Sequence, residues 1–202
     1  MKRLDPDQAR LEAAKAAVSS DLEMKVLTVK NWLEPDYVPQ IFARLDVQAG
    51  TIRPIAGEEY LEDVLAPKLD PAVPREIRRL SEIGRGIMAY GYFFYPLYAV
   101  SVDELYRVAE AAARLRVSQE GGPSGRKFEV LIDWLSSKSV LTPDETTRWH
   151  ALRSLRNRGT HRNRPTMFPA TMAVSLAQTV AEDINALFGV PRPRRRRAPP
   201  VR

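Results

Sequence analysis

The chain has 202 residues, of which 44% are hydrophobic and 28% are charged. This length and composition favour one globular domain with appendages over two large domains or a wholly disordered chain. It contains no cysteine and only two histidines, which excludes disulfides and thiol chemistry and leaves no recognisable set of metal ligands. We therefore expect neither a metal nor another cofactor.

The net charge of +6 is concentrated at the C-terminus. Residues 189–202 contain six arginines and no acid, so residues 1–188 keep 25 of the 31 basic side chains against 25 acidic ones. The body is therefore neutral. Within it, residues 146–181 also lack any acid, and we expect this stretch to attract anions through six arginines: Arg148, Arg153, Arg156, Arg158, Arg162 and Arg164.

The N-terminus carries charges throughout and lacks the apolar run of a secretory signal. The longest uncharged segment, Gly86–Val102, has only 17 residues and contains glycine and proline, which favours a buried helix over a membrane span. We expect a soluble, cytoplasmic protein without a membrane partner.

Residues 1–73 are predicted to form an N-terminal helix and an extended arm. Strong helix formers and amphipathic spacing predict a helix from Asp7 to about Lys30. Prolines and β-branched residues predict an extended or irregular arm over Glu34–Gly57, with one short strand as an option. A short helix is predicted over Glu58–Leu65. This arm could bind a protein partner.

Residues 74–189 are predicted to form an up-and-down helical bundle, an all-α fold, because dense helical signals are separated by short breaks. Its five helices are expected over Arg75–Tyr95, 102–117, 124–136, 142–162 and Phe168–Phe188. Two capping boxes, Ser101–Glu104 and Thr142–Glu145, predict where the second and fourth helices start. Ser124 is the predicted N-cap of the third helix.

The tail 190–202 is rich in arginine and proline, and we expect it to be disordered. It is either a solubilising coil or an RNA-binding arm whose affinity depends on salt. The loop Gly121–Gly125, followed by Arg126 and Lys127, is more simply a connector than a phosphate-binding loop.

Aromatic residues are concentrated in the predicted helix that ends at Tyr95 and just beyond it. Consecutive aromatics point all round a helix, so some must face away from the immediate core. A core plus a dimer interface is favoured over base stacking. The residues are Tyr90, Tyr92, Phe93, Phe94, Tyr95 and Tyr98.

The fourth predicted helix has the most specific pattern. Trp149, Leu152 and Leu155 form an apolar face, while Arg153, Asn157 and His161 recur at intervals of four on another face, with Arg156 beside it. A permanent cation and a group that titrates near neutral pH suit phosphodiester cleavage without a metal. The alternative is a solvated basic face with a histidine near the helix end.

The segment Arg156-Asn157-Arg158-Gly159-Thr160-His161 resembles the R-x4-6-H motif of the HEPN superfamily, including the polar residue directly after the arginine. The preceding helix–loop–helix also looks HEPN-like, and the resemblance covers about residues 74–189. It implies a metal-independent ribonuclease fold that is commonly dimeric, with the motifs of two protomers facing one cleft. An acidic residue on an earlier helix often accompanies the motif, and Glu110 or Glu104 could be that residue.

The resemblance implies a catalytic set of Arg156, Asn157, His161 and Glu110. RNA as partner would contact arginines beside the motif and in the tail: Arg153, Arg158, Arg162, Arg164, Arg194, Arg195, Arg196 and Arg197. Since many HEPN-like domains are not catalytic, the alternative is an adaptor that uses the bundle for homodimerisation and the N-terminal arm for a protein partner.

Overall fold

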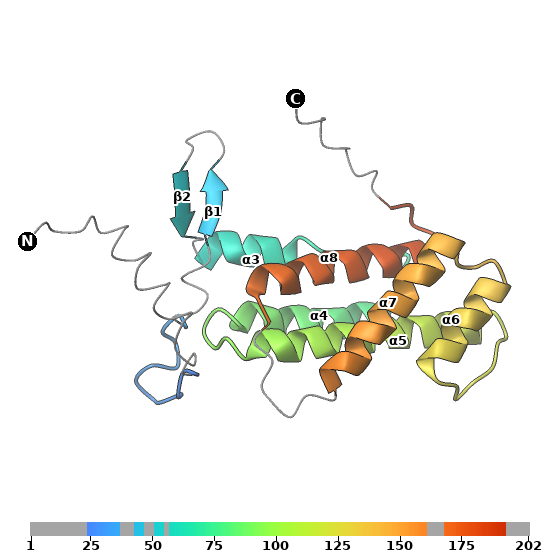
Figure 1. Cartoon of the computed structure of the whole chain (residues 1–202), viewed down its shortest axis with the longest axis horizontal. Helices are drawn as coiled ribbons and strands as arrows, with labels where there is room; N and C mark the ends of the chain where they lie inside the picture. Colours follow the sequence, from blue (N-terminus) through green and yellow to red (C-terminus); the bar gives the residue numbers. More distant parts are fainter. Residues whose placement is uncertain (1–23, 37–42, 47–50, 55–56, 161–167, 193–202) are drawn as a thin grey trace, which may run out of the picture.

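The computed structural model of the chain describes residues 24–36, 43–46, 51–54, 57–160 and 168–192 (Figure 1). Within these ranges helices form the body and two short strands form a hairpin. The elements are strands β1 (Ala43–Asp46) and β2 (Thr51–Pro54) and helices α3 (Gly57–Leu65), α4 (Arg75–Tyr90), α5 (Leu97–Gln119), α6 (Phe128–Ser137), α7 (Pro143–Thr160) and α8 (Ala170–Leu187).

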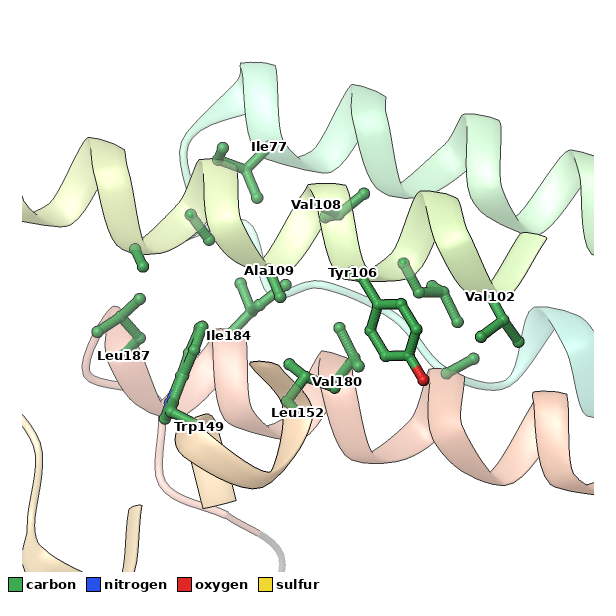
Figure 2. Close-up of a cluster of buried hydrophobic side chains, with 14 of the residues drawn as sticks. Ile77, Val102, Tyr106, Val108, Ala109, Trp149, Leu152, Val180, Ile184 and Leu187 are labelled. Atoms are coloured by element: carbon green, nitrogen blue, oxygen red, sulfur yellow. The ribbon is translucent and has the colours of Figure 1, made fainter. Parts of the chain in front are cut away.

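Helix α5 lies at the centre of the helical bundle and contacts α4, α6, α7 and α8. It can do so because its buried face carries small side chains: Ala109, Ala112 and Ala113 are fully buried and let neighbouring helices approach closely. Figure 2 shows side chains of α4, α5, α7 and α8 meeting in one apolar cluster. Each large side chain in it contributes about 1.5–3 kcal/mol through burial. The expected all-α bundle is therefore present.

The extended arm contains a short strand, an option in the sequence-based prediction, paired with a second one. Strands β1 and β2 are antiparallel, and Ala43 lies opposite Pro54 while Asp46 lies opposite Thr51. Proline is tolerated at the last position of a strand in a two-stranded ribbon, because the backbone N–H that it lacks would lie at the end of the strand pair. The short helix expected over Glu58–Leu65 is confirmed as α3.

The helix predicted up to Lys30 is wrong for its described part. Residues 24–28 have no regular structure and 29–33 form a turn. The reason is local competition by polar side chains: Asn31 Oδ1 accepts from the Thr28 N–H at 2.8 Å, and Asn31 Nδ2 donates to the Val26 carbonyl at 3.0 Å. Residues 7–23 of that prediction lie outside the described residues.

The break between α4 and α5 falls five residues earlier than predicted. Helix α4 ends at Tyr90 rather than Tyr95. The chain then turns so that the Tyr98 ring lies against Gly91, where a Cβ would be only 2.8 Å from the ring, so glycine is needed for this close approach. Pro96 begins α5 instead of ending α4. The capping box at Ser101 is therefore wrong: Ser101 is buried inside α5, and its hydroxyl donates to the Tyr98 carbonyl at 2.8 Å.

Of the two other predicted helix caps, one is wrong and one is confirmed. Ser124 does not cap α6, which begins at Phe128 after Lys127. The box at Thr142 is confirmed: the Thr142 N–H donates to Glu145 Oε2 at 2.9 Å, and the Glu145 N–H donates to Thr142 Oγ1 at 3.3 Å. Helix α8 starts two residues after Phe168 and ends at Leu187.

Candidate functional site

The C-terminal half of α7 leaves the core and presents polar side chains at the surface. Trp149 and Leu152 are buried, as their spacing predicted (Figure 2). Leu155 is not: 42% of its surface is exposed. The apolar face thus ends at Leu152, although α7 still contacts α6 through Arg153 and α5 through Arg156. The motif residues follow this boundary.

Arg156 and Glu110 meet across α7 and α5. Arg156 Nη1 donates to Glu110 Oε2, and Arg114 Nη2 donates to the other carboxylate oxygen, Oε1, at 2.7 Å. The Glu110 side chain is only 18% exposed, whereas that of Arg156 is 36% exposed. Of the two acids considered from sequence, Glu104 lies instead 4.0 Å from Arg107. The structure therefore brings together Arg156 and Glu110.

The remaining candidate residues fall into three groups. Asn157 is exposed directly after Arg156, and Arg153 pairs with Glu129 on α6 at 3.2 Å. The backbone of Arg158 is part of α7, and its side chain is not among those that the structure describes. The other predicted catalytic and RNA-binding positions lie outside the described residues altogether: His161, Arg162, Arg164, Arg194, Arg195, Arg196 and Arg197.

The positive charge of the acid-free stretch, residues 146–181, is offset by acids that lie on other helices. Its described arginine side chains each pair with an acid from another helix: Arg148 with Asp183 of α8, Arg153 with Glu129 of α6, and Arg156 with Glu110 of α5. Sequence-local charge counting missed this, because the acids are between 24 and 46 positions away in the chain. Anion attraction here is consequently weaker than six adjacent arginines would suggest.

Asp183 is a buried carboxylate that sequence reasoning missed. Its side chain is 4% exposed, and the same oxygen, Oδ1, accepts from Arg148 Nε at 3.2 Å and from Arg192 Nη2. Burial raises the pKa of Asp183, and the two guanidiniums oppose that rise. The sequence feature that could have revealed Asp183 is its position as an acid on the otherwise apolar buried face of α8. Arg192 thereby attaches the start of the tail to the bundle.

The second histidine links α7 to α6. His150 Nε2 lies 3.0 Å from Asp133 Oδ1, with the histidine side chain 30% exposed and the aspartate 63% exposed. This pair is separate from the Arg156–Glu110 contact. Across the described ranges, no group of three or more His, Asp or Glu side chains could hold a metal ion.

The aromatic cluster lies mainly in the turn between α4 and α5 rather than along one helix. Tyr95 and Tyr98 are buried, and Tyr92 stacks on Tyr60 of α3 with ring centroids 5.7 Å apart. Burial raises the pKa of Tyr60 and of Tyr98. Tyr90, in contrast, is 65% exposed. The cluster therefore serves the core at its centre and reaches the surface at Tyr90.

The N-terminal segment is joined to this aromatic turn by hydrogen bonds. The backbone N–H of buried Asp36 donates to the Tyr92 carbonyl at 2.9 Å, and Asp36 Oδ2 accepts from the Tyr95 N–H at 2.8 Å. Lys25 Nζ donates to the Phe93 carbonyl at 3.0 Å. Neither Asp36 nor Lys25 stood out in the sequence, because their partners are backbone groups that no motif specifies.

The same N-terminal segment carries large apolar side chains on its outer side. Val29 is 92% exposed and Trp32 is 58% exposed. Isolated exposed apolar residues are ordinary, but six within ten residues form a concentrated surface. They are Met24, Val26, Leu27, Val29, Trp32 and Leu33.

No family model matches the chain, and no curated protein or solved structure is significantly similar to it. None of the helices in the described ranges combines the length and the apolar character needed to cross a membrane.

Proposed function

We propose that this protein is a HEPN-like, metal-independent endoribonuclease or RNA-binding protein that acts as a cytoplasmic homodimer. The observation that supports it most is the meeting of Arg156 with Glu110. The R-x4-6-H resemblance implies an arginine late in a helical bundle, often accompanied by an acid from an earlier helix. Glu110 lies beside Arg156 in this way, whereas Glu104 lies near Arg107 instead.

Each residue of the site has a chemical task in the proposed reaction. His161 transfers a proton, as base toward the ribose 2′-hydroxyl or as acid toward the departing 5′-oxygen. Arg156 stabilises the charge that develops on the phosphate oxygens. Glu110 is a positioning residue, since it fixes the Arg156 guanidinium, and exposed Asn157 orients the histidine or the substrate. The nucleophile is the substrate's own hydroxyl, which leaves a 2′,3′-cyclic phosphate.

The experiment that tests this function uses the purified full chain, mixed RNA and a chelating agent. We expect cleavage that the chelator does not change, and products that end in 2′,3′-cyclic phosphate. Arg156→Lys should cleave poorly while remaining folded, because an ammonium cannot reproduce the two-pronged contact of a guanidinium with phosphate. Cleavage that requires added metal, or that Arg156→Lys leaves intact, contradicts the proposal.

A non-catalytic adaptor is the second candidate, and the exposed apolar segment supports it. Side chains such as Val29 and Trp32 suit a protein partner, as the expectation for the N-terminal arm requires. Both candidates are homodimers, but only the composite cleft needs the motifs to face each other. Light scattering that shows a monomer at tens of micromolar, roughly where ordinary homodimers are assembled, removes both the composite-site mechanism and dimerisation of the adaptor through its bundle. The adaptor instead requires complex formation that Trp32→Ala weakens.

A further inference from the structure

Arg114 connects the Arg156–Glu110 pair to the loop between α5 and α6. While its Nη2 donates to Glu110, its Nη1 donates to the backbone carbonyl of Arg126 at 3.1 Å. A continuous chain of contacts thus runs from Arg156 through Glu110 and Arg114 to Arg126. Because Arg126 takes part through its carbonyl oxygen alone, its side chain remains available for other contacts.

The surface beside this chain of contacts is basic and accessible. The Arg114 side chain is 43% exposed, and Arg126 and Lys127 are both exposed residues. We call these three residues the α5–α6 basic strip. Three acids on α5, α6 and the loop between them are already paired: Glu110 with two arginines, Glu120 with Arg116 at 2.8 Å, and Glu129 with Arg153 at 3.2 Å.

The charge balance of this corner of the molecule is positive. The strip, with Arg153 and Arg156 of α7, contributes five cations. Glu110 and Glu129, which pair with those two α7 arginines, contribute two negative charges, so five less two leaves a net charge of +3. The body as a whole is neutral, so this excess is a local property. A polyanion is therefore the complementary partner.

We propose that Arg114, Arg126 and Lys127 bind the phosphate backbone of single-stranded RNA next to the phosphate that Arg156 contacts. This inference rests on the proposed function, because it takes the RNA bound at Arg156 as its starting point. Only the Glu110 carboxylate separates Arg156 from Arg114, so a strand held at Arg156 brings its neighbouring phosphates over the strip. Phosphate contacts of this kind position the strand without reading its sequence.

The test removes the two strip charges that do not support the fold. Arg126→Gln with Lys127→Gln keeps the Arg126 carbonyl and hence the contact with Arg114. Lys30→Gln with Lys138→Gln is the matched control, since both lysines are exposed and lie outside the strip. Fluorescence anisotropy on the full chain measures binding of a labelled RNA of about 12 nucleotides, within the usual site sizes, over a range of salt concentrations.

We expect the strip variant to bind this RNA more weakly and to lower the slope of log K against log salt by about 1.4, or about 0.7 for each lost contact. Binding of a dinucleoside monophosphate should not change, because its single phosphate is taken by Arg156 and leaves none for the strip. The control variant should change neither slope nor short-substrate binding by a comparable amount.

Each contrary result overturns a defined statement. If wild type neither binds nor cleaves RNA, the proposed function fails and the strip fails with it. If wild type cleaves RNA and depends on Arg156, but the strip variant behaves like the control, only the strip is overturned. Tighter binding of an oligoglutamate peptide of equal charge than of the RNA would assign the strip to an acidic protein partner and overturn the RNA assignment.

Discussion

The Arg156 guanidinium and the Glu110 carboxylate form an ion pair across α7 and α5, although the two residues are 46 positions apart in the chain. Glu110 is the less exposed partner and also accepts from Arg114. A carboxylate held by two guanidiniums fixes the direction of both. The geometry of the candidate site therefore depends on Glu110, even though that residue need not touch a substrate.

Glu110→Gln should lower the free energy of unfolding by about 1 kcal/mol, because it removes the negative charge that both guanidiniums contact and replaces one of the two acceptor oxygens with an amide NH2 group. It should also reduce RNA cleavage, since Arg156 loses its fixed orientation. Urea unfolding and a cleavage assay check the two effects. Glu62→Gln, at an exposed position of α3, is the control. Unchanged cleavage in a stable Glu110→Gln protein would contradict the positioning role.

Asp36→Ala should destabilise the protein by about 1–3 kcal/mol, since it leaves the Tyr95 N–H without its buried acceptor. Asp36→Asn keeps an acceptor oxygen and should cost less. Denaturant unfolding measures the loss, and limited proteolysis tests whether residues 24–36 separate from the aromatic turn. Equal stability of the alanine and asparagine variants would show that this hydrogen bond contributes little.

The helices were largely predictable from sequence because their signals are local. The box at Thr142 specifies the start of α7 through contacts within four residues. Ser101 carries the same pattern and failed, because Gly91 and Pro96 had already set the turn upstream. A capping pattern predicts a helix start only where the chain is free to turn. The chain is free to turn before Thr142, whereas Ser101 lies inside α5.

The candidate site was predictable only in part. The resemblance identified Arg156 and offered Glu110 or Glu104 as its acid, with Glu110 in the expected catalytic set, but the contact between Arg156 and Glu110 depends on how α5 packs against α7. The pairing of Arg148 with Asp183 likewise joins residues that no local pattern connects. Such contacts are decided by helix packing, which composition and periodicity do not specify. Charge counting along the chain consequently overestimated the free positive charge of α7.

The buried carboxyl of Asp183 should make stability depend on pH. Its folded-state pKa is raised by burial, so the folded state binds more protons than the unfolded state between its ordinary value of about 4 and the raised value. Stability from this group is therefore fully present below the ordinary value and is lost as the pH rises through the raised one. Urea unfolding of wild type and Asp183→Asn across this window should show the advantage of wild type shrinking with rising pH. A constant difference would contradict the raised pKa.

Removal of residues 193–202 should weaken RNA binding and flatten its salt dependence without unfolding the bundle. The cut follows Arg192 because that residue pairs with Asp183, whereas a cut before Pro191 would also remove that partner. Five arginines are lost, so the slope of log K against log salt should fall by up to about 3.5 if each contacts a phosphate. Thermal unfolding should not change. An unchanged slope would mean that the tail does not touch RNA.

His161→Ala separates an enzyme from a binding module. If His161 transfers the proton in cleavage, its loss should slow the reaction by about 10²–10⁴-fold, the usual contribution of general acid–base catalysis. RNA affinity should barely change, because phosphate binding rests on the arginines. His150→Ala is the matched control, since that histidine pairs with Asp133 away from the motif.

The substrate provides an independent check on the same step. RNA with a 2′-deoxy substitution at the cut site should bind wild type normally and resist cleavage, since the attacking hydroxyl is missing. Single-turnover cleavage rates and anisotropy measured on the same RNA distinguish chemistry from binding. Should His161→Ala cleave as fast as wild type, or should the deoxy substrate be cut, the proton-transfer role of His161 is wrong and the adaptor becomes the better interpretation.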